Sequence, residues 1–242
     1  VAVVVQTLES TCPGADLVGM RSPSASAPST YGPLATIYAT LAHLYSGGAI
    51  QACQRWAVQS VPAGARVLFA GSGPGTDVVQ AAQAGLRVTA VDCCPAMLEA
   101  TSRRAHRAGV EQRVELVNAD LLRRTPSADY DVVIAQFFLN VFAAKRLPQV
   151  LGALAGFLRP GGRLVVGDFA PMPGGRHPLQ RIYHDLPMHG LARLGANDVH
   201  NIHDLPAQLQ AAGFTVRERR RFRLFGVGPG WIEGLVAERE YP

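Results

Sequence analysis

The amino-acid sequence predicts an α/β fold, a doubly wound and mostly parallel seven-stranded sheet with helices on both faces. Two observations carry this prediction. Short apolar runs of strand length alternate with segments of helical periodicity through residues 66–169, which is typical of a parallel sheet covered by helices. A glycine-rich turn, Gly71-Ser-Gly-Pro-Gly75, follows the first apolar run and precedes the first helical segment. Open parallel sheets bind nucleotides at such turns.

Each element is justified by its own pattern. The expected strands are the apolar, β-branched runs at residues 66–70, 87–91, 113–117, 130–135, 163–169, 214–224 and 231–239. The expected helices are the periodic segments between them, at 75–84, 95–108 and 145–158, together with an N-terminal helical segment at 33–59. Pro95 fits the first turn of its helix, and Gly47-Gly48 is the expected break in the N-terminal segment.

The domain organisation follows from composition. Residues 1–30 are rich in Ser, Pro, Ala and Gly, which predicts a flexible arm. Residues 31–242 are predicted to form a single domain. At about 170–212 the β/α alternation pauses, and five of the seven histidines lie in this stretch. We therefore expect a helical cap insertion that walls the ligand site at the carboxyl ends of the strands.

Composition excludes several classes of protein. The net charge of +5 comes almost wholly from arginine, because Lys145 is the only lysine. Five arginines cluster late in the chain, at positions 217, 219, 220, 221 and 223. No nucleic-acid motif accompanies them, which favours a charged edge strand over a phosphate-binding patch. No apolar run is long enough to span a bilayer. Without an export signal or zinc spacing, the four cysteines are expected to be reduced thiols in a cytoplasm.

The glycine turn and Asp92 together indicate the ligand. Asp92 ends the second expected strand, where a carboxylate can accept hydrogen bonds from ribose hydroxyls. The third glycine comes one residue earlier than in the dinucleotide fingerprint, and Thr76 holds its expected place, which favours S-adenosylmethionine (SAM) over NAD. Two alternatives stay open: a tight turn without a ligand, and Asp92 as a cap of the following helix.

Five segments stand in the order typical of class I SAM-dependent methyltransferases: 67–76, 91–92, 118–120, 130–136 and 158–165. From residue 33 onward the chain resembles this family. Phe138-Leu-Asn-Val141 and Asp168-Phe-Ala-Pro171 resemble segments of its ubiquinone/menaquinone C-methyltransferases. The resemblance implies methyl transfer from SAM to a small, apolar or aromatic metabolite. Phe69 replaces the family's acid in the first strand, and Leu139 replaces an arginine of the quinone group.

The resemblance also implies a set of cofactor-binding residues: Gly71, Ser72, Gly73, Gly75, Asp92, Cys93, Met97, Asp120, Leu121, Gln136 and Phe137. Asp92 would hold the ribose and Asp120 the adenine amine, while Gln136 and Phe137 would face the sulfonium and the substrate. Met97 is equally suited to core packing. Tyr31 or Tyr38 would close over the cofactor.

Methyl transfer needs the nucleophile, the methyl carbon and the sulfur held in line. A base is needed only for an acceptor that arrives protonated, and histidine suits that task. The catalytic candidates are His184, His200, His203, Tyr183 and Asn140, and Asp168 is a further candidate for orienting the substrate.

No metal is expected, because His200, His203 and Asp204 do not complete a ligand set, and Asp204 or Asn201 fits a helix cap. The expected partner is a small-molecule acceptor and no nucleic acid, with a homodimer if the chain associates. Two alternatives remain: an NAD-dependent oxidoreductase, and a non-catalytic protein of the same fold.

Overall fold

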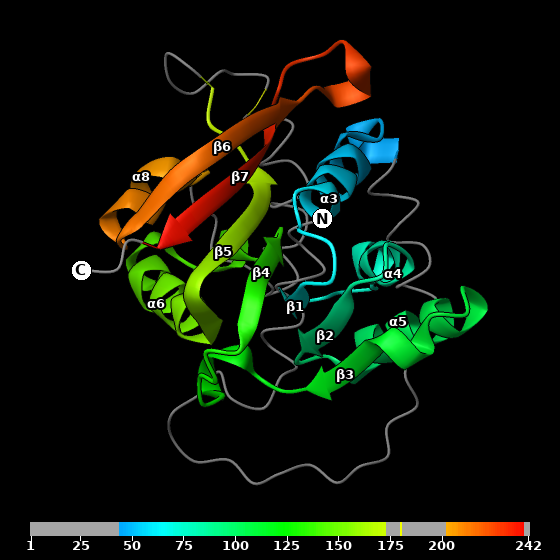
Figure 1. The fold of residues 1–242 in the computed structure, drawn as a ribbon. Coiled ribbons are helices and arrows are strands. Elements are labelled where there is room, and N and C mark those ends of the chain that lie inside the picture. The colour runs from blue at the N-terminus through cyan, green and yellow to red at the C-terminus, as the bar shows by residue number, and fades with distance from the viewer. Residues whose placement is uncertain (1–43, 173–179, 181–201, 240–242) are drawn as a thin grey trace, which may run out of the picture.

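A seven-stranded sheet forms the centre of the molecule, in the strand order β3-β2-β1-β4-β5-β7-β6 (Figure 1). The computed structural model of the chain describes residues 44–172, 180 and 202–239. The strands are β1 (Arg66–Ala70), β2 (Arg87–Asp92), β3 (Val114–Asn118), β4 (Tyr130–Gln136), β5 (Leu158–Phe169), β6 (Phe214–Phe222) and β7 (Ile232–Arg239). The predicted fold class is confirmed, and all seven expected strands are present.

The sheet is parallel except for one strand. β1 pairs in parallel with β2 and with β4, and β4 pairs in parallel with β5. β7 lies antiparallel between β5 and β6. The chain winds outward in both directions from the β1–β4 pair, which is therefore the topological switch point where such sheets bind ligands.

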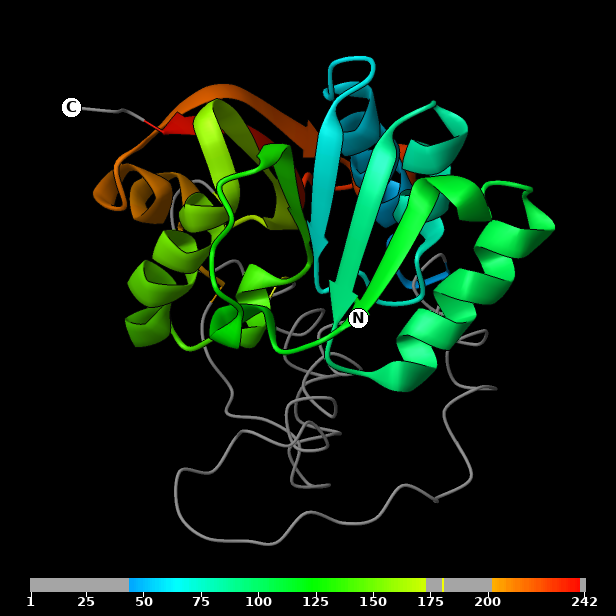
Figure 2. The ribbon, with the colours of Figure 1, turned by 60° about the horizontal axis from the view of Figure 1, so that its bottom comes forward.

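Helices cover both faces of the sheet (Figure 2). α3 (Ala49–Gln59), α4 (Thr76–Gln83) and α5 (Pro95–Arg107) lie on one face, and α6 (Leu147–Phe157) and α8 (Leu205–Ala211) lie on the other. Each interface is an apolar core of its own, as a sheet buried on both sides requires. On the first face Trp56 packs so closely on β7 that a side chain at Gly234 would overlap its ring.

Several boundaries differ from those expected. β5 begins at Leu158 and not at 163, because Leu158 already pairs with Tyr130 before a register shift. Residues 205–211, expected within the cap insertion, form α8 instead. Its Leu205 and Leu209 are buried in the core beside α6, so these residues belong to the core layer. The cap insertion itself stays a prediction, because residues 173–179 and 181–201 lie outside the described residues. Asp204 caps α8 through a bond from Ala207 N–H to its Oδ1 (3.3 Å), as expected.

The arginine-rich segment forms β6, which lies at the edge of the sheet as expected. Its arginines pair with carboxylates of the neighbouring strand: Arg217 with Glu238 (2.9 Å) and Arg219 with Glu233 (2.7 Å). The expected break at Gly47-Gly48 is confirmed, because both glycines have positive φ angles ahead of α3. The expected arm at 1–30 lies outside the described residues. Within the described part of the chain, no helix has the length and apolar character to cross a bilayer.

Candidate active site

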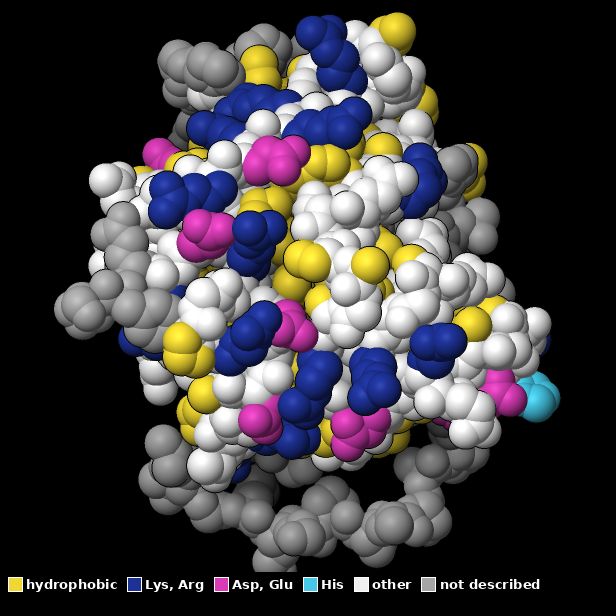
Figure 3. Space-filling view, in the orientation of Figure 1, with side chains coloured by type: hydrophobic (Ala, Val, Ile, Leu, Met, Phe, Trp, Pro, Cys, Tyr) yellow, Lys and Arg dark blue, Asp and Glu magenta, His cyan; other side chains and the backbone are white. Residues whose placement is uncertain are grey.

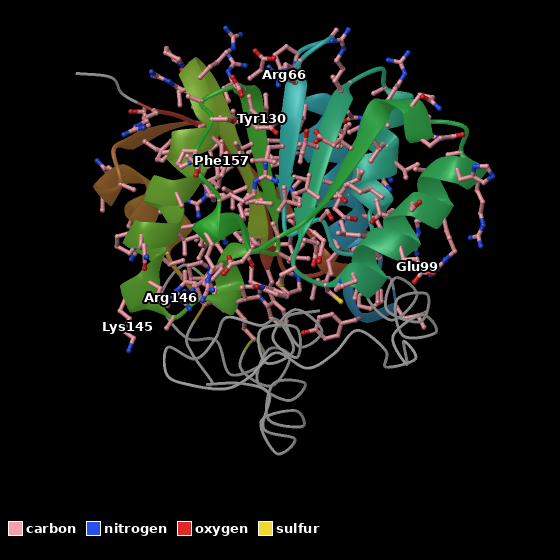
Figure 4. All side chains as sticks on the ribbon, turned by 90° about the horizontal axis from the view of Figure 1, so that it is seen from below. Arg66, Glu99, Tyr130, Lys145, Arg146 and Phe157 are labelled. Atoms are coloured by element: carbon pink, nitrogen blue, oxygen red, sulfur yellow. The ribbon has the colours of Figure 1, made fainter. Side chains whose placement is uncertain are left out.

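The carboxyl ends of β1, β2 and β4 meet at one edge of the sheet and bring the predicted cofactor residues together. Residues 71–75 leave β1 there, Asp92 ends β2, and Gln136 ends β4. Figure 4 shows Arg66 and Tyr130 at the opposite, amino edge, with Lys145 and Arg146 toward the carboxyl edge. The ligand position at the switch point of such a sheet therefore lies at this carboxyl edge.

The three glycines of the turn have positive φ angles of 63° at Gly71, 52° at Gly73 and 74° at Gly75. A side chain at Gly71 would overlap the Phe138 ring, and one at Gly75 would overlap Thr101. Gly73 differs, because a Cβ built there meets no described atom within 4 Å. Gly71 and Gly75 are thus required by packing inside the protein. At Gly73 the missing side chain leaves space that no described residue fills, so a ligand can approach the backbone there.

Asp92 holds this turn in place. Its Oδ2 accepts a hydrogen bond from Gly73 N–H (2.7 Å), and its Oδ1 accepts one from Cys94 N–H (2.8 Å). Burial raises the pKa of Asp92, and these backbone N–H groups oppose that rise. The N-cap of α5 is Cys94, with no side-chain cap, so the alternative of Asp92 as the helix cap is not supported. A carboxylate has lone pairs beyond these two bonds, which ribose hydroxyls can use.

Two residues of α5 that the sequence did not single out fasten the turn from the other side. Thr101 Oγ1 donates to Gly73 O (3.1 Å), and Arg104 Nη1 donates to Pro74 O (2.6 Å). Residues three apart on a helix share a face. That spacing, on the helix directly after Asp92, is the signal by which they could have been found.

The end of β4 is arranged differently from the prediction. Phe137 is buried and packs edge-on against Phe169, with ring centroids 5.6 Å apart, so it contributes to the core, and its contact with the sulfonium and the substrate stays a prediction. The Gln136 side chain points to α3, with Oε1 3.8 Å from Cys53 Sγ. Phe138, which follows, contacts the glycine turn at Gly71. The positive φ of Phe137 (53°) redirects the chain at this point, and no sequence pattern indicated it.

The other predicted cofactor residues lie around the ends of β2 and β3. Met97 is fully buried with Cys94, Ala96 and Ala100, which matches the core-packing alternative. Asp120 accepts a hydrogen bond from Leu122 N–H (3.0 Å) and pairs with Arg123.

Leu121, beside Asp120, is buried in the core on the α6 face. The contacts of Asp120, Leu121 and Met97 with adenine remain predictions.

The cysteines differ from the expectation in one case. Cys53 and Cys94 are free and buried, as expected of reduced thiols. Cys93 is disulfide-bonded, so the prediction that all four cysteines are reduced is wrong for Cys93. Its backbone N–H acts on Asp92, where it opposes the rise in the pKa of that carboxyl.

Buried carboxylates lie beneath the site. Asp77, in the first turn of α4, is 4% exposed, and burial raises its pKa to about 6. Asp168 is the penultimate residue of β5 and is opposite Glu233 of β7 in the antiparallel register. Burial raises the pKa of Asp168 to about 7, and the charge of Glu233 adds to that rise. Phe69, which replaces the family's usual acid, is buried in the core beneath α3 and α4.

Asp168 also positions the segment after β4. Its Oδ2 accepts from Asn140 N–H (3.1 Å), and its Oδ1 accepts from Phe169 N–H (2.8 Å). The Asn140 side chain is buried, and neither of its amide atoms forms a hydrogen bond of good geometry among the described residues, although it weakly lowers the pKa of Asp168. An unpaired buried amide is costly, so Asn140 is suited to a polar ligand.

His203 is the predicted catalytic histidine that the structure describes. It is 8% exposed, and its Nε2 lies 2.9 Å from Phe142 O, two residues after Asn140. His184, His200 and Tyr183 lie outside the described residues, as do Tyr31 and Tyr38. Within the described ranges, no group of three or more metal-ligating side chains forms a metal site.

The residues of the turn fit an adenosyl cofactor. Ser72 Oγ is buried without a hydrogen-bond partner in the described structure, and it lies between Gly71 and Gly73. Gly73 faces open space and Asp92 supplies a carboxylate beside it. Exposed backbone, an unsatisfied hydroxyl and an acceptor for ribose hydroxyls are what such a nucleoside requires.

Comparisons with known proteins agree with this geometry. A family model described as a methyltransferase domain matches residues 67–162. The demethylmenaquinone methyltransferase of a Thermus thermophilus strain is 31% identical over 206 residues, which are 77% of this chain and 92% of that protein. The chain belongs to the class I SAM-dependent methyltransferases.

Other similarities to this methyltransferase family are shorter or more distant. The demethylmenaquinone methyltransferase of Tropheryma whipplei (strain Twist) is 33% identical over 142 residues, which are 57% of this chain. The chain spans about half the length of that relative (56%). The structure of Burkholderia thailandensis 1,6-didemethyltoxoflavin-N1-methyltransferase superposes with a TM-score of 0.62 and 21% sequence identity. The aligned region covers 92% of this chain and 94% of that protein.

Fold and family together decide against one alternative. An NAD-binding Rossmann sheet has six parallel strands in the order 3-2-1-4-5-6. Here the antiparallel β7 lies between β5 and β6. This strand order and the family match together do not favour the oxidoreductase interpretation.

Proposed function

We propose that this chain transfers the methyl group of SAM to a small, apolar or aromatic metabolite. One observation carries the proposal: Gly73, whose Cβ position meets no described atom within 4 Å, donates a hydrogen bond to the Asp92 carboxylate at the switch point of a methyltransferase sheet. The bound cofactor would supply an activated methyl group. The protein's contribution is to hold the acceptor in line with it and to exclude water.

The acceptor class is supported by apolar side chains at the carboxyl edge. Phe138 lies over Gly71, and its ring packs edge-on against Phe142 with centroids 5.1 Å apart. Pockets for small ligands are lined mainly by such aromatic side chains, with few polar groups that fix orientation. Asn140, two residues after Phe138, is the proposed polar group. The names of two relatives, which contain demethylmenaquinone and 1,6-didemethyltoxoflavin, support a ring compound.

Asp77 is our candidate for the negative charge that Phe69 does not supply. It is a buried carboxylate directly after the glycine turn, and its charge acts on Cys53, which is buried in the same core as Phe69. The α-ammonium group of SAM would stabilise the ionised form of Asp77 and lower its pKa from about 6.

The cofactor assignment is tested by calorimetry of SAM binding. Asp92→Ala should weaken binding by about 1–3 kcal/mol, because it removes an acceptor for ribose hydroxyls and releases Gly73. Glu99→Ala is the matched control, since Glu99 is an exposed carboxylate on the adjacent helix, paired with Arg103. Equal affinity of both variants for SAM would refute the assignment.

The role of a base is tested by turnover. His184, His200 and His203 are the proposed bases for an acceptor that arrives protonated, with Tyr183 orienting the substrate. Replacement of the true base by Ala should reduce turnover by about 10²–10⁴ with SAM affinity unchanged. If all three variants retain normal turnover, catalysis proceeds by positioning alone.

The non-catalytic alternative is distinguished by the same assays. A protein that binds SAM with normal affinity and yields no methylated product from any quinone, phenol or heteroaromatic acceptor would favour it.

A further inference from the structure

The tip of the β6–β7 hairpin, residues 223–231, carries apolar side chains in an exposed position. Within the described residues, the exposed large hydrophobic side chains are Leu44 (65%), Phe225 (64%) and Val227 (84%). Phe225 and Val227 belong to the tip, and the Phe225 ring occupies the space that a side chain at Gly47 would need. The tip therefore meets the residues just before α3 at one corner of the molecule (Figure 1).

Arginines surround this apolar corner. Between Glu218 and Glu233 the sequence holds four arginines and no acid. Arg219 is neutralised by Glu233, and Arg221 donates to Pro171 O (3.0 Å). Arg220 and Arg223 are exposed and form no ion pair within the described residues. Figure 3 shows Lys and Arg side chains gathered along β6 up to the tip.

The backbone of the tip presents Phe225 in an unusual way. Phe225 has a φ of 52°, a left-handed backbone conformation that is unfavourable for a residue with a Cβ. Gly226 beside it also has a positive φ. Because the Phe225 ring is mostly exposed, core packing does not offset this cost. Backbone strain that packing does not explain points to function.

The tip lies at the same edge as the glycine turn. β5 ends at Phe169 opposite Ile232, where β7 begins, so the hairpin leaves the sheet at the carboxyl edge. β4 and β5 separate β1 from β7 in the strand order. At about 4.8 Å per strand, the tip is about 15–20 Å along the edge from the glycine turn.

We propose that this tip docks on the surface of an anionic lipid bilayer. Phe225 and Val227 would enter the boundary between headgroups and acyl chains, and Arg220 and Arg223 would pair with lipid phosphates. Charge complementarity selects this occupant over a second copy of the chain, because a symmetric contact would bring the arginines of two tips together.

The inference goes beyond methyl transfer. A docked tip holds the carboxyl edge near the membrane, where an apolar acceptor would be concentrated. That consequence rests on the proposed function, whereas the docking itself does not.

The test is co-sedimentation of the full chain with vesicles, in the absence of SAM and acceptor. The protein should bind vesicles of equal parts phosphatidylglycerol and phosphatidylcholine and not those of phosphatidylcholine alone, and added salt should weaken binding. Phe225→Asn with Val227→Ser should lower the partition coefficient at least about tenfold. Asn tolerates a positive φ, so this variant should fold, as circular dichroism can check.

The charge contribution is tested by matched pairs. Arg220→Gln with Arg223→Gln should lower partition about fivefold per arginine, which corresponds to about 1 kcal/mol each. Arg87→Gln with Arg107→Gln removes the same charge from exposed positions at the start of β2 and the end of α5, and it should leave partition unchanged.

Three results would overturn the proposal. They are absence of binding to anionic vesicles at low salt, equal losses in both arginine pairs, and a dimer by light scattering that Phe225→Asn abolishes without any vesicle binding. None of them would bear on SAM affinity, so failure here is distinguishable from failure of the proposed methyl transfer.

Discussion

Individual residues at the glycine turn differ in what they do, although their sequence context is similar. Gly71 and Gly75 leave room for Phe138 and Thr101, which are parts of the protein itself. Gly73 leaves room for something outside the described chain. Asp92 connects the two roles, since it fixes Gly73 and lies beside the open space.

Gly73→Ala should therefore abolish most SAM binding, because the added methyl group projects into the space proposed for the cofactor. Gly85→Ala is the matched control: Gly85 also has a positive φ (88°) and no described atom near its Cβ position, but it lies before β2 at the amino edge. Both variants should lose about 1 kcal/mol of stability. Calorimetry and thermal unfolding separate the two effects, and equal SAM affinities would contradict the assignment of the turn.

At the scale of elements, α5 holds the glycine turn that follows β1 through side-chain hydrogen bonds. Helix α4 and strand β2 separate the turn from α5 in sequence, yet Thr101 and Arg104 donate hydrogen bonds to the carbonyl groups of Gly73 and Pro74. The turn is thereby held from both sides, by Asp92 of β2 and by one face of α5.

Thr101→Val keeps the shape of the side chain and removes its hydroxyl. We expect a loss of about 1 kcal/mol of stability and a several-fold rise in the Kd for SAM, because Gly73 is no longer fixed from this side. Thr101→Ser keeps the hydroxyl and should therefore retain the wild-type stability and the wild-type Kd for SAM. Ser102→Ala, at the exposed neighbouring position, serves as the control. If SAM affinity is unchanged in Thr101→Val, α5 contributes to the fold alone.

At the scale of the whole molecule, buried carboxylates make stability depend on pH. Burial raises the pKa of Asp168 to about 7 and that of Asp77 to about 6, above the ordinary value of 3.8. Burial also raises the pKa of Glu233. The folded chain therefore binds more protons than the unfolded chain between about pH 4 and pH 7, and the free energy of unfolding falls as pH rises through that interval.

Urea denaturation at about pH 5 and about pH 8 should show a lower free energy of unfolding at the higher pH. Asp168 alone accounts for at most about 3 kcal/mol of this difference, because about two pH units separate pH 5 from its pKa of about 7, at about 1.4 kcal/mol for each pKa unit. Asp168→Asn should reduce the difference, whereas Asp129→Asn, at an exposed position, should preserve it. A wild-type protein that is more stable at the higher pH would contradict the raised pKa values.

The sequence by itself determined the sheet, because strand runs and helix periods are local patterns with distinct spacings. It located all seven strands, the glycine turn and Asp92, and through the motifs it determined the family. These features depend on residues that are close in sequence: Gly73 and Asp92 are one helix and one strand apart, and the parallel fold brings the ends of neighbouring strands together.

Only the tertiary structure decided which side chains meet at the site. Phe137 turns into the core and Phe138 meets Gly71 because of one positive φ angle, which no local pattern encodes. The placement of α8 in the layer beside α6 depends on Leu205 and Leu209 finding a core built by residues far away in the chain. The raised pKa of Asp168 likewise arises from burial and from Glu233, brought opposite it by an antiparallel strand pair. Such contacts form between residues that are far apart in the chain, and their energies depend on the whole folded structure. Local sequence patterns therefore do not show which residues meet.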